Sequence, residues 1–444
     1  MSWKAELVLL IMGYTLLNYY CGLYYANESN KHKKLVLNLS MIINVGLLVV
    51  FKYLGFFSET AHDLGILLGI SYAIPIIKVV LPVGISFYTF QTMGYNLDVY
   101  YNRISPERHL GRFALYVSFF PQLVAGPIER AGNLLIQFKI KPKVTYENFS
   151  HGLAIFFWGL FKKVVIADRL AIFVDAVYGT PASFQGEVML IAVFFFSIQL
   201  FCDFSGYSDM AIGMSYMMGF SLMQNFDLPY KSQSITEFWR RWHISLSSWF
   251  QDYIFNPLAI YFRDHGKAGV MLGIFITFFL SGLWHGANWN YVVFGVLHGV
   301  ILIYEFRTRK ARKKLTKKWN KLMVAYTSIF LTFLYATFTF IFFRSSSLGE
   351  AWVVIEQCFS GYSVHPSGIY EAIKSVGMNK LDFLVALGSL VFLAFVTLLR
   401  RNEQYLQFMH DYPVGAKWAI KLVILFGIII FGVDGGDQFI YFQF

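Results

Sequence analysis

Long apolar segments, separated by short basic or polar stretches, occupy most of the chain. A helix that crosses a bilayer needs about 20 mostly apolar residues, and several segments reach this length. The clearest are residues 6–26, 35–57, 152–178, 188–220, 268–304, 323–343, 381–399 and 416–433. The pattern predicts an all-α polytopic membrane protein with room for roughly ten crossing helices. We find neither an internal repeat nor a soluble domain, and we treat residues 1–444 as a single integral-membrane domain.

Two further apolar segments, residues 66–101 and 113–128, are interrupted by proline and glycine. Proline removes a backbone donor and kinks a helix. Non-helical backbone at membrane depth must be covered by protein or line a cavity. Basic clusters flank the segment 113–128 on both sides, so both of its ends are predicted to be cytoplasmic. This segment is either a re-entrant broken helix or a proline-kinked crossing helix.

Charged residues lie inside two of the apolar segments. Residues 152–178 contain Lys162, Lys163, Asp168 and Arg169. This segment therefore forms either two short helices or one helix whose charges face protein. Residues 188–220 contain the motif Asp203-Phe-Ser-Gly-Tyr-Ser-Asp209. Its acids and serines suggest a break that lines a polar cavity, and the alternative is that they cross-link neighbouring helices.

Residues 234–257 have a different, amphipathic pattern. Ser234 and Glu237 match a capping box, in which the two side chains satisfy free backbone donors at a helix start. Aromatic and aliphatic residues recur at intervals of three and four and define one face. They are Phe238, Trp239, Trp242, Leu246, Trp249, Phe250 and Tyr253. We predict one amphipathic helix, ended by Pro257, at a membrane interface or at the rim of a cavity.

Composition agrees with a membrane protein, because only 14% of the residues are charged and soluble domains carry about 25%. The net charge of +11 then indicates basic residues on the cytoplasmic side of the helices, and no nucleic-acid partner is expected. Residues 307–321 contain no acid. They fix that loop in the cytoplasm, and we interpret them as an anchor near anionic lipid of the bilayer.

The stretch 278–295 is apolar yet contains His285, flanked by Trp284 and followed by Asn288. An ionisable side chain at bilayer depth usually marks a pathway or a reaction centre. A metal site is not expected. On a straight helix His285 and His298 would be about 20 Å apart, and no HExxH pair occurs. The chain also lacks a GxSxG nucleophile motif and a glycine-rich phosphate loop.

An acyl transfer in which the protein contributes a base does fit these residues. A hydroxyl acceptor must lose its proton as it attacks an activated acyl group. A buried imidazole tends to stay neutral and can accept that proton. The alternative for His285 is a hydrogen-bonded residue that packs one helix against another.

Several long motifs resemble one known family. Phe238-Trp-Arg-Arg-Trp-His-Ile-Ser-Leu-Ser247, followed by Gly282-Leu-Trp-His-Gly286, resembles the membrane-bound O-acyltransferase (MBOAT) family. The similarity is to its bacterial alginate O-acetyltransferase-like branch. Residues 81–88, 123–130 and 203–213 and the Phe-Gln-Phe ending also resemble that branch. The resemblance weakens in residues 344–380.

The resemblance implies a fold of about eleven transmembrane helices, with re-entrant or interfacial helices, around a central tunnel. It implies that His285 is the essential histidine and that His243 lies across the same channel. The donor would be cytoplasmic acetyl-CoA, with no bound cofactor. The acetyl group would pass to an extracytoplasmic polysaccharide, with the help of an SGNH-hydrolase-like partner protein. The implied location is the inner (cytoplasmic) membrane of a bacterial cell.

Five further residues are candidates for substrate binding. Arg240 and Arg241 can attract the anionic donor, although interfacial anchors would show the same pattern. Trp284 and Asn288 lie beside His285, and Asp203 lies in the separate motif 203–213.

Other interpretations stay open at this point. The donor could be D-alanine on a small carrier protein, as in teichoic-acid D-alanylation. The broken helices and intramembrane polar residues would also suit a small-molecule transporter, although the two halves show no repeat symmetry. Cys202, beside Asp203, could carry the acyl group covalently.

Overall fold

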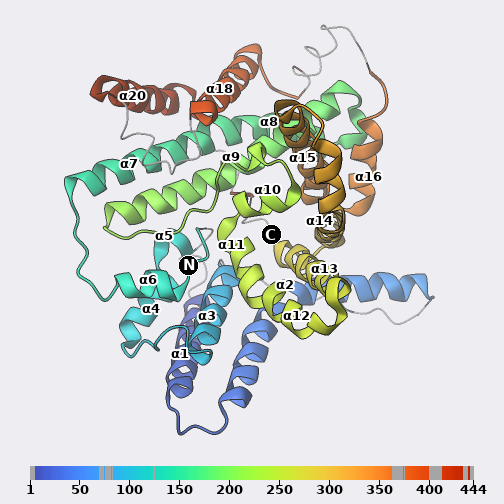
Figure 1. The fold of residues 1–444 in the computed structure, drawn as a ribbon. Coiled ribbons are helices and arrows are strands. Elements are labelled where there is room, and N and C mark those ends of the chain that lie inside the picture. Colours follow the sequence, from blue (N-terminus) through green and yellow to red (C-terminus); the bar gives the residue numbers. More distant parts are fainter. Residues whose placement is uncertain are drawn as a thin grey trace.

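The computed structural model describes residues 6–69, 84–123, 126–362, 376–399, 413–433 and 439–440, with Pro75, Pro82 and Lys374. Every regular element in these ranges is a helix, which confirms the predicted all-α class (Figure 1). Seven of the described helices are long and apolar enough to cross a membrane, and Trp418–Phe431 is a shorter apolar helix. The total of about eleven crossing helices stays a prediction. The predicted irregular segment 66–101 and the chain's last residues lie partly outside the described ranges.

The first three helices form one group, held together by asparagines. They are α1 (Glu6–Ala26), α2 (Lys33–Leu67) and α3 (Ile85–Tyr100). Asn18 on α1 and Asn44 on α2 exchange side-chain hydrogen bonds of 3.1 and 3.0 Å, and Asn96 on α3 donates to Asn18 at 2.5 Å. Hydrogen bonds between polar side chains join membrane helices in this way, because the surrounding lipid is as apolar as the helix surfaces.

The segment 113–128 consists of short helices. They are α4 (Leu110–Ser118), α5 (Phe120–Leu123) and, just after it, α6 (Ala131–Gln137). The chain is extended at Phe119, with φ −61° and ψ 105°. Helices this short cannot cross a bilayer. The described part of the segment therefore favours the re-entrant alternative, while Val124 and Ala125 lie outside the described residues.

A long helical hairpin follows. Its parts are α7 (Tyr146–Phe161), the π-helix η1 (Lys162–Ala167), α8 (Asp168–Gly179), the 3₁₀ turn η2 (Pro181–Ser183) and α9 (Glu187–Met217). The predicted break in α9 is wrong, because the helix runs unbroken through residues 203–209. Its acids pair with lysines of the π-helix. Lys162 lies 2.8 Å from Asp209, and Lys163 lies 2.8 Å from Asp203. The charges thus face protein, as one alternative for residues 152–178 predicted.

Paired glycines allow α7 and α9 to approach closely. A Cβ atom at Gly213 would lie 2.5 Å from the carbonyl oxygen of Gly152, and one at Gly206 would lie 2.8 Å from that of Gly159. Membrane helices use such small residues to bring their backbones together. This contact fixes the two helices that hold the buried lysine–aspartate pairs.

The predicted amphipathic helix 234–257 is broken into pieces. The pieces are α10 (Ile235–Arg241), α11 (Ile244–Phe250), the π-helix η4 (Gln251–Phe255) and α12 (Asn256–Tyr261). The break lies at His243, whose φ of 45° is incompatible with a continuous right-handed helix. Pro257 does not end the helix, because it lies in the first turn of α12, where its missing N–H is tolerated. The predicted cap is confirmed, since Ser234 Oγ accepts from Glu237 N at 3.1 Å.

The segment 268–304 is a helical hairpin. It contains α13 (Gly266–His285) and α14 (Trp289–Thr316), joined by residues 286–288. His285 and His298 therefore lie on different helices, and the distance expected for two residues of one straight helix does not apply to them. His298 is held by other contacts, because its Nδ1 accepts from Trp239 Nε1 at 3.2 Å and its Nε2 lies 3.1 Å from Thr339 Oγ1.

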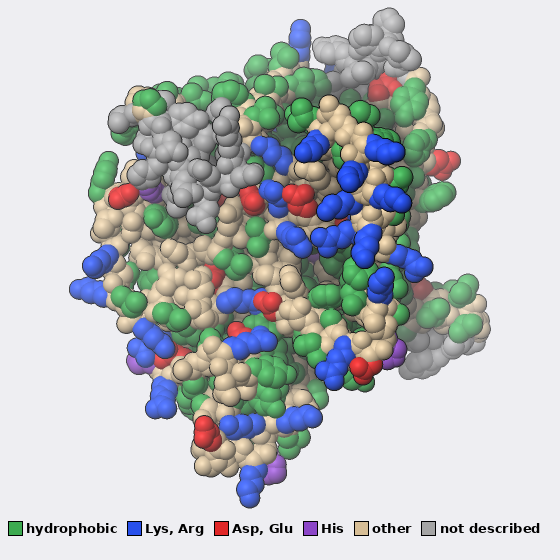
Figure 2. Space-filling model, viewed as in Figure 1, with side chains coloured by type: hydrophobic (Ala, Val, Ile, Leu, Met, Phe, Trp, Pro, Cys, Tyr) green, Lys and Arg blue, Asp and Glu red, His purple; other side chains and the backbone are tan. Residues whose placement is uncertain are grey.

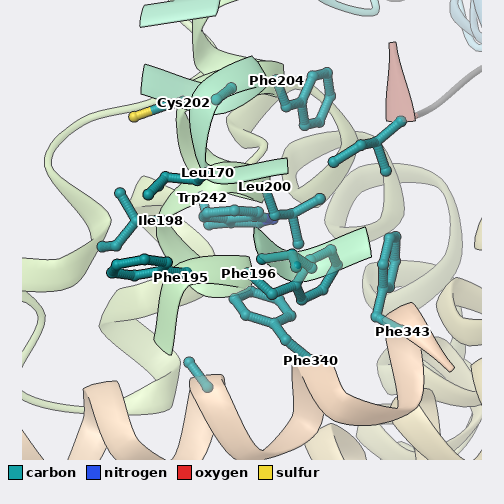
Figure 3. Close-up of a cluster of buried hydrophobic side chains, with 14 of the residues drawn as sticks. Leu170, Phe195, Phe196, Ile198, Leu200, Cys202, Phe204, Trp242, Phe340 and Phe343 are labelled. Atoms are coloured by element: carbon teal, nitrogen blue, oxygen red, sulfur yellow. The ribbon is translucent and has the colours of Figure 1, made fainter. Parts of the chain in front are cut away.

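The remaining helices follow the basic loop. They are α15 (Lys321–Arg344), α16 (Leu348–Gln357), α18 (Lys380–Leu399) and α20 (Val414–Phe431), while η3 (Pro229–Lys231) and η5 (Arg263–His265) are 3₁₀ turns earlier in the chain. An aromatic core joins α9, α15 and the break before α11. In Figure 3, Phe340 and Phe343 extend from α15 toward side chains such as Phe196 and Trp242. The ring centroids of Trp242 and Phe340 are 5.4 Å apart.

Candidate active site

His285 is the last residue of α13 and lies at the turn of the α13–α14 hairpin. The two helices touch at Gly282 and Gly295, where a Cβ atom on either glycine would lie 2.9 Å from the Cα of the other. This close approach brings the buried imidazole of His285 against two aromatic rings. Its centroid is 5.6 Å from that of Phe294 and 5.3 Å from that of Phe343. The ring is therefore enclosed by protein.

His243 lies between α10 and α11 with φ 45° and ψ 55°. Its side chain is fully buried. Asn225 holds the backbone after it, because the Asn225 carbonyl accepts from Ile244 N at 2.9 Å and the Asn225 side-chain oxygen accepts from Ser245 N at 3.2 Å. A left-handed conformation at a residue with a Cβ costs about 1–3 kcal/mol and persists only when its surroundings hold it. Such strain is concentrated at functional sites.

Trp284 connects the two histidines. Its ring centroid is 5.8 Å from that of His243 and 5.1 Å from that of His285. Phe90, on α3, packs on the same indole at 5.6 Å. The structure thus brings together three of the sequence-predicted site residues, in an aromatic enclosure built from α3, α13 and the α10–α11 break.

A cavity of about 970 Å³ opens between α10, α11, α13 and α14. Two of its lining residues, Thr277 and Ser281, precede His285 on α13 by two turns and one turn. Residues four apart lie on the same face of a helix. All three side chains are buried. Thr277 and Ser281 line the cavity, whereas His285 lies one helical turn beyond the lining and is enclosed by aromatic rings. The cavity also confirms that the aromatic helix segment 234–257 lies at a cavity rim.

The other end of the cavity is basic. Its lining includes Arg240, Arg241, Arg309 and Arg312. Figure 2 shows Lys and Arg side chains gathered where Figure 1 places α10 and the end of α14. This is the predicted cytoplasmic side. Two arginines of the basic run therefore line the cavity, in addition to the lipid-anchor role that the sequence suggested for that run.

The four arginines are not equivalent. Arg241 is paired with Asp227 at 3.2 Å and with Glu237 at 3.0 Å. Glu305, a further acid of the lining, accepts hydrogen bonds from Ile235 N at 2.7 Å and from Thr236 N at 2.9 Å. Within the described ranges, no carboxylate pairs with Arg240 or Arg309. The cavity therefore keeps unneutralised positive charge at its mouth, which suits an anionic ligand.

Of the predicted site residues only Arg240 and Arg241 line the cavity, and two candidates, Asp203 and Asn288, serve the fold elsewhere. Asp203 is buried, pairs with Lys163, and accepts a hydrogen bond from Ile440 N at 2.9 Å. Asn288 caps α14, because its side-chain oxygen accepts from Asn290 N at 3.0 Å and its Nδ2 donates to the Ser346 carbonyl at 2.9 Å. Both sets of contacts connect segments of the fold. Cys202 is fully buried in the aromatic core (Figure 3).

Sequence reasoning missed Lys52, Asn225 and Arg309. Lys52 gave a usable signal, since it is a lysine inside a predicted crossing helix. Arg309 was hidden in a run of basic residues. Asn225 carried no signal, because a single asparagine in a loop does not reveal which backbone it will hold.

This fold and site define a multi-pass membrane protein in which two buried histidines lie near an arginine-lined cavity, whose lining includes Arg241 and Ser281. The family model described as MBOAT, membrane-bound O-acyltransferase family, matches residues 101–347. The chain belongs to this family, and it is an acyltransferase.

Three relatives illustrate the range of the similarity. A probable alginate O-acetylase AlgI of Pseudomonas putida is 34% identical, over 100% of this chain and 91% of the relative. A peptidoglycan O-acetyltransferase of Helicobacter pylori is also 34% identical, over 80% of this chain and 70% of the relative. A teichoic acid D-alanyltransferase of Bacillus subtilis is 29% identical, over 59% of this chain and 68% of the relative.

Proposed function

We propose that this chain is a membrane O-acetyltransferase that modifies a secreted or cell-wall polysaccharide. The donor is acetyl-CoA from the cytoplasm, and the acceptor is a hydroxyl group on the other side of the membrane. The observation that carries the proposal is the arginine-lined cavity, whose lining includes Ser281, one helical turn before the buried His285. The names of the O-acetylating relatives support the same reaction class.

In this reaction His285 acts as the general base. The imidazole takes the proton of the acceptor hydroxyl as its oxygen attacks the thioester carbonyl carbon. The carbon–sulfur bond then breaks, and the imidazolium returns the proton to the departing CoA thiolate. His243, whose ring packs against that of Trp284, is proposed to orient the reacting groups. A positioned base contributes typically 10²–10⁴-fold to the rate of such a transfer.

The basic mouth of the cavity supports an anionic donor. A CoA molecule carries phosphates, and arginine binds phosphate through charge-assisted hydrogen bonds. Arg240 and Arg309 are proposed to contact these groups, because they line the cavity and keep their charge. A cavity of about 970 Å³ is large enough for a cofactor-sized ligand.

The acceptor side completes the proposal. We propose that the protein lies in the cytoplasmic membrane of a bacterial cell, with its basic loop 307–321 inside. An extracytoplasmic SGNH-hydrolase-like protein is the proposed partner that passes the acetyl group to the polysaccharide.

A second candidate donor is D-alanine on a carrier protein. The 29% identity to a teichoic acid D-alanyltransferase favours it. A binding assay distinguishes the two donors, because the purified protein should bind acetyl-CoA directly and should not require an acylated carrier protein.

The test of the function is the variant His285→Ala. In cells that carry it in place of the natural gene, ester-linked acetate on the cell-surface polysaccharide should fall by at least about 10²-fold, because the base is lost. His243→Ala should lower acetylation too. Acetate released from purified polysaccharide by mild base is the measured quantity.

The matched control is His265→Ala, which removes an exposed histidine at the start of α13. It should leave acetylation unchanged. Wild-type acetylation in the His285→Ala strain, with the protein inserted at normal levels, would show that His285 is not the base.

A further inference from the structure

The C-terminal end of α13 is capped by side chains of another helix. The last four carbonyl groups of a helix have no partner within it. Here Tyr53 Oη donates to the Leu283 carbonyl at 2.5 Å, and Lys52 Nζ donates to the carbonyls of Trp284 and His285 at 2.5 and 3.3 Å. Two neighbouring residues of α2 thus satisfy three consecutive carbonyls at the end of the helix that carries His285.

This cap replaces the usual one. Many helices end with a glycine in the left-handed conformation. Gly286, the residue after α13, is instead extended, with φ −171° and ψ 157°. A cation at this end also interacts favourably with the helix dipole. Because a charged side chain inside a membrane is expensive, Lys52 must make contacts that offset its cost.

The same ammonium group also lies near the Trp284 indole. Its Nζ lies 5.6 Å from the centre of the Trp284 ring, a distance at which a cation attracts an aromatic face. That ring packs against both His243 and His285. Lys52 therefore holds the backbone of His285 and lies beside the indole that packs against both histidines.

We propose that Lys52, assisted by Tyr53, is a positioning residue of the acyl-transfer site. The two side chains set where α13 ends, and thereby the position of the His285 imidazole relative to Trp284 and the acceptor hydroxyl. This role rests on the proposed function of His285 as the base. It concerns α2, a helix that lies outside the residues matched by the family model.

The test compares Lys52→Met with Lys52→Arg. Methionine keeps the length of the side chain but removes the charge and the donors. We expect kcat for acetyl transfer from acetyl-CoA to fall on the order of 10²-fold, the typical effect of a misplaced catalytic group. The KM for acetyl-CoA should stay within about twofold, because the donor cavity is untouched. Lys52→Arg restores a cation and hydrogen-bond donors, and its kcat should be at least about tenfold higher than that of Lys52→Met.

Lys421→Met is the matched control. Lys421 is another lysine in an apolar helix, α20, where it lies 3.3 Å from Ser150 Oγ. Its loss should leave kcat unchanged. Thermal melting and size-exclusion profiles of each full-length variant in detergent establish that the fold is retained.

Tyr53→Phe keeps the test decisive if Lys52→Met fails to fold. It removes one hydroxyl donor and should lower kcat by about tenfold, corresponding to about 1.4 kcal/mol of activation free energy. Wild-type kcat in folded Lys52→Met, or in Tyr53→Phe, would overturn the positioning role. If His285→Ala were fully active the proposed function would fall as well, whereas an inactive His285→Ala beside a fully active Lys52→Met would remove only the inference about Lys52.

Discussion

The backbone of His243 depends on Asn225 for its conformation. The peptide groups on its C-terminal side are held by the Asn225 carbonyl and side-chain oxygen, and the Asn225 amide donates in turn to Ser208 Oγ at 3.2 Å. Without these bonds, relaxation of the left-handed conformation would release about 1–3 kcal/mol of strain. The histidine ring would then leave its place beside Trp284.

Asn225→Ala should therefore reduce activity more than it reduces the amount of folded protein. The change leaves the buried Ser245 N–H without its acceptor, which costs about 1–3 kcal/mol. We expect kcat to fall by at least about tenfold, since 1.4 kcal/mol of activation free energy corresponds to that factor. Turnover per folded molecule is the measurement. The partly exposed Asn148→Ala serves as the control, and equal turnover in both variants would contradict the role of Asn225.

At this scale the sequence pointed to some residues of the candidate site and not to others. His243, Trp284 and His285 could be predicted, because each lies in a motif of adjacent residues. Lys52 could be noticed as a charge in an apolar helix, but its acceptors lie 232 and 233 positions away. Asp203 attracted attention as an acid in an apolar segment, and the pattern could not show that Lys163 would neutralise it.

The short helices α4, α5 and α6 are fastened by buried carboxyl groups. Glu129, just before α6, accepts hydrogen bonds from Asn133 Nδ2 at 2.7 Å and from Met223 N in the loop after α9. Burial raises the pKa of Glu129 to about 7, although these donors favour the charged form. In the unfolded chain the pKa is near 4.5.

Stability should consequently fall as the pH rises through this window. Between about 4.5 and 7 the folded protein retains a proton that the unfolded chain has lost, so each increase in pH favours unfolding. The effect amounts to about 3 kcal/mol at most. The melting temperature of the wild type in detergent should drop between about pH 5 and about pH 7.5, and that of Glu129→Gln should drop less. An identical pH dependence of the melting temperature in the wild type and in Glu129→Gln would show that Glu129 is not the cause.

Helix locations were predictable from hydrophobic periodicity, whereas helix breaks were not. The acids of α9 suggested a break, but ion pairs to the π-helix satisfied them without one. In the segment 234–257 the regular aromatic spacing concealed a break, since the spacing of Phe238, Trp242 and Leu246 is preserved on either side of His243. Helix breaks are decided by contacts with distant segments, and the local spacing of hydrophobic residues carries no information about such contacts.

The molecule as a whole has a basic face, with the cavity opening toward it. This asymmetry was predictable, because every charged residue in the stretch 307–321 is basic. The cavity itself was not predictable, since its lining comes from two stretches, residues 227–255 and 270–312, whose mutual packing the sequence does not reveal.

The double variant Arg240→Gln with Arg309→Gln tests this asymmetry. Loss of two unpaired cations at the cavity mouth should raise the KM for acetyl-CoA by about tenfold, equivalent to about 1.4 kcal/mol, with little change in kcat. The increase should shrink at high salt, which screens the charges in the wild type. Lys317→Gln with Lys318→Gln, two exposed residues of the same basic run, should leave the KM unchanged. An unaltered KM in the arginine variant would argue against donor binding at this mouth.

The cap on α13 also has a consequence for biogenesis. Lys52 is synthesised more than two hundred residues before the carbonyl groups that it will bind. A lysine at the centre of an inserting helix costs about 2.5–3.5 kcal/mol, and for this interval nothing from α13 offsets that cost. The nascent α2 must therefore be sheltered by the insertion machinery, or reach with its ammonium toward the nearer water layer. When the α13–α14 hairpin inserts, its carbonyl groups accept hydrogen bonds from Lys52. Assembly of the site and stable insertion of α2 are therefore coupled.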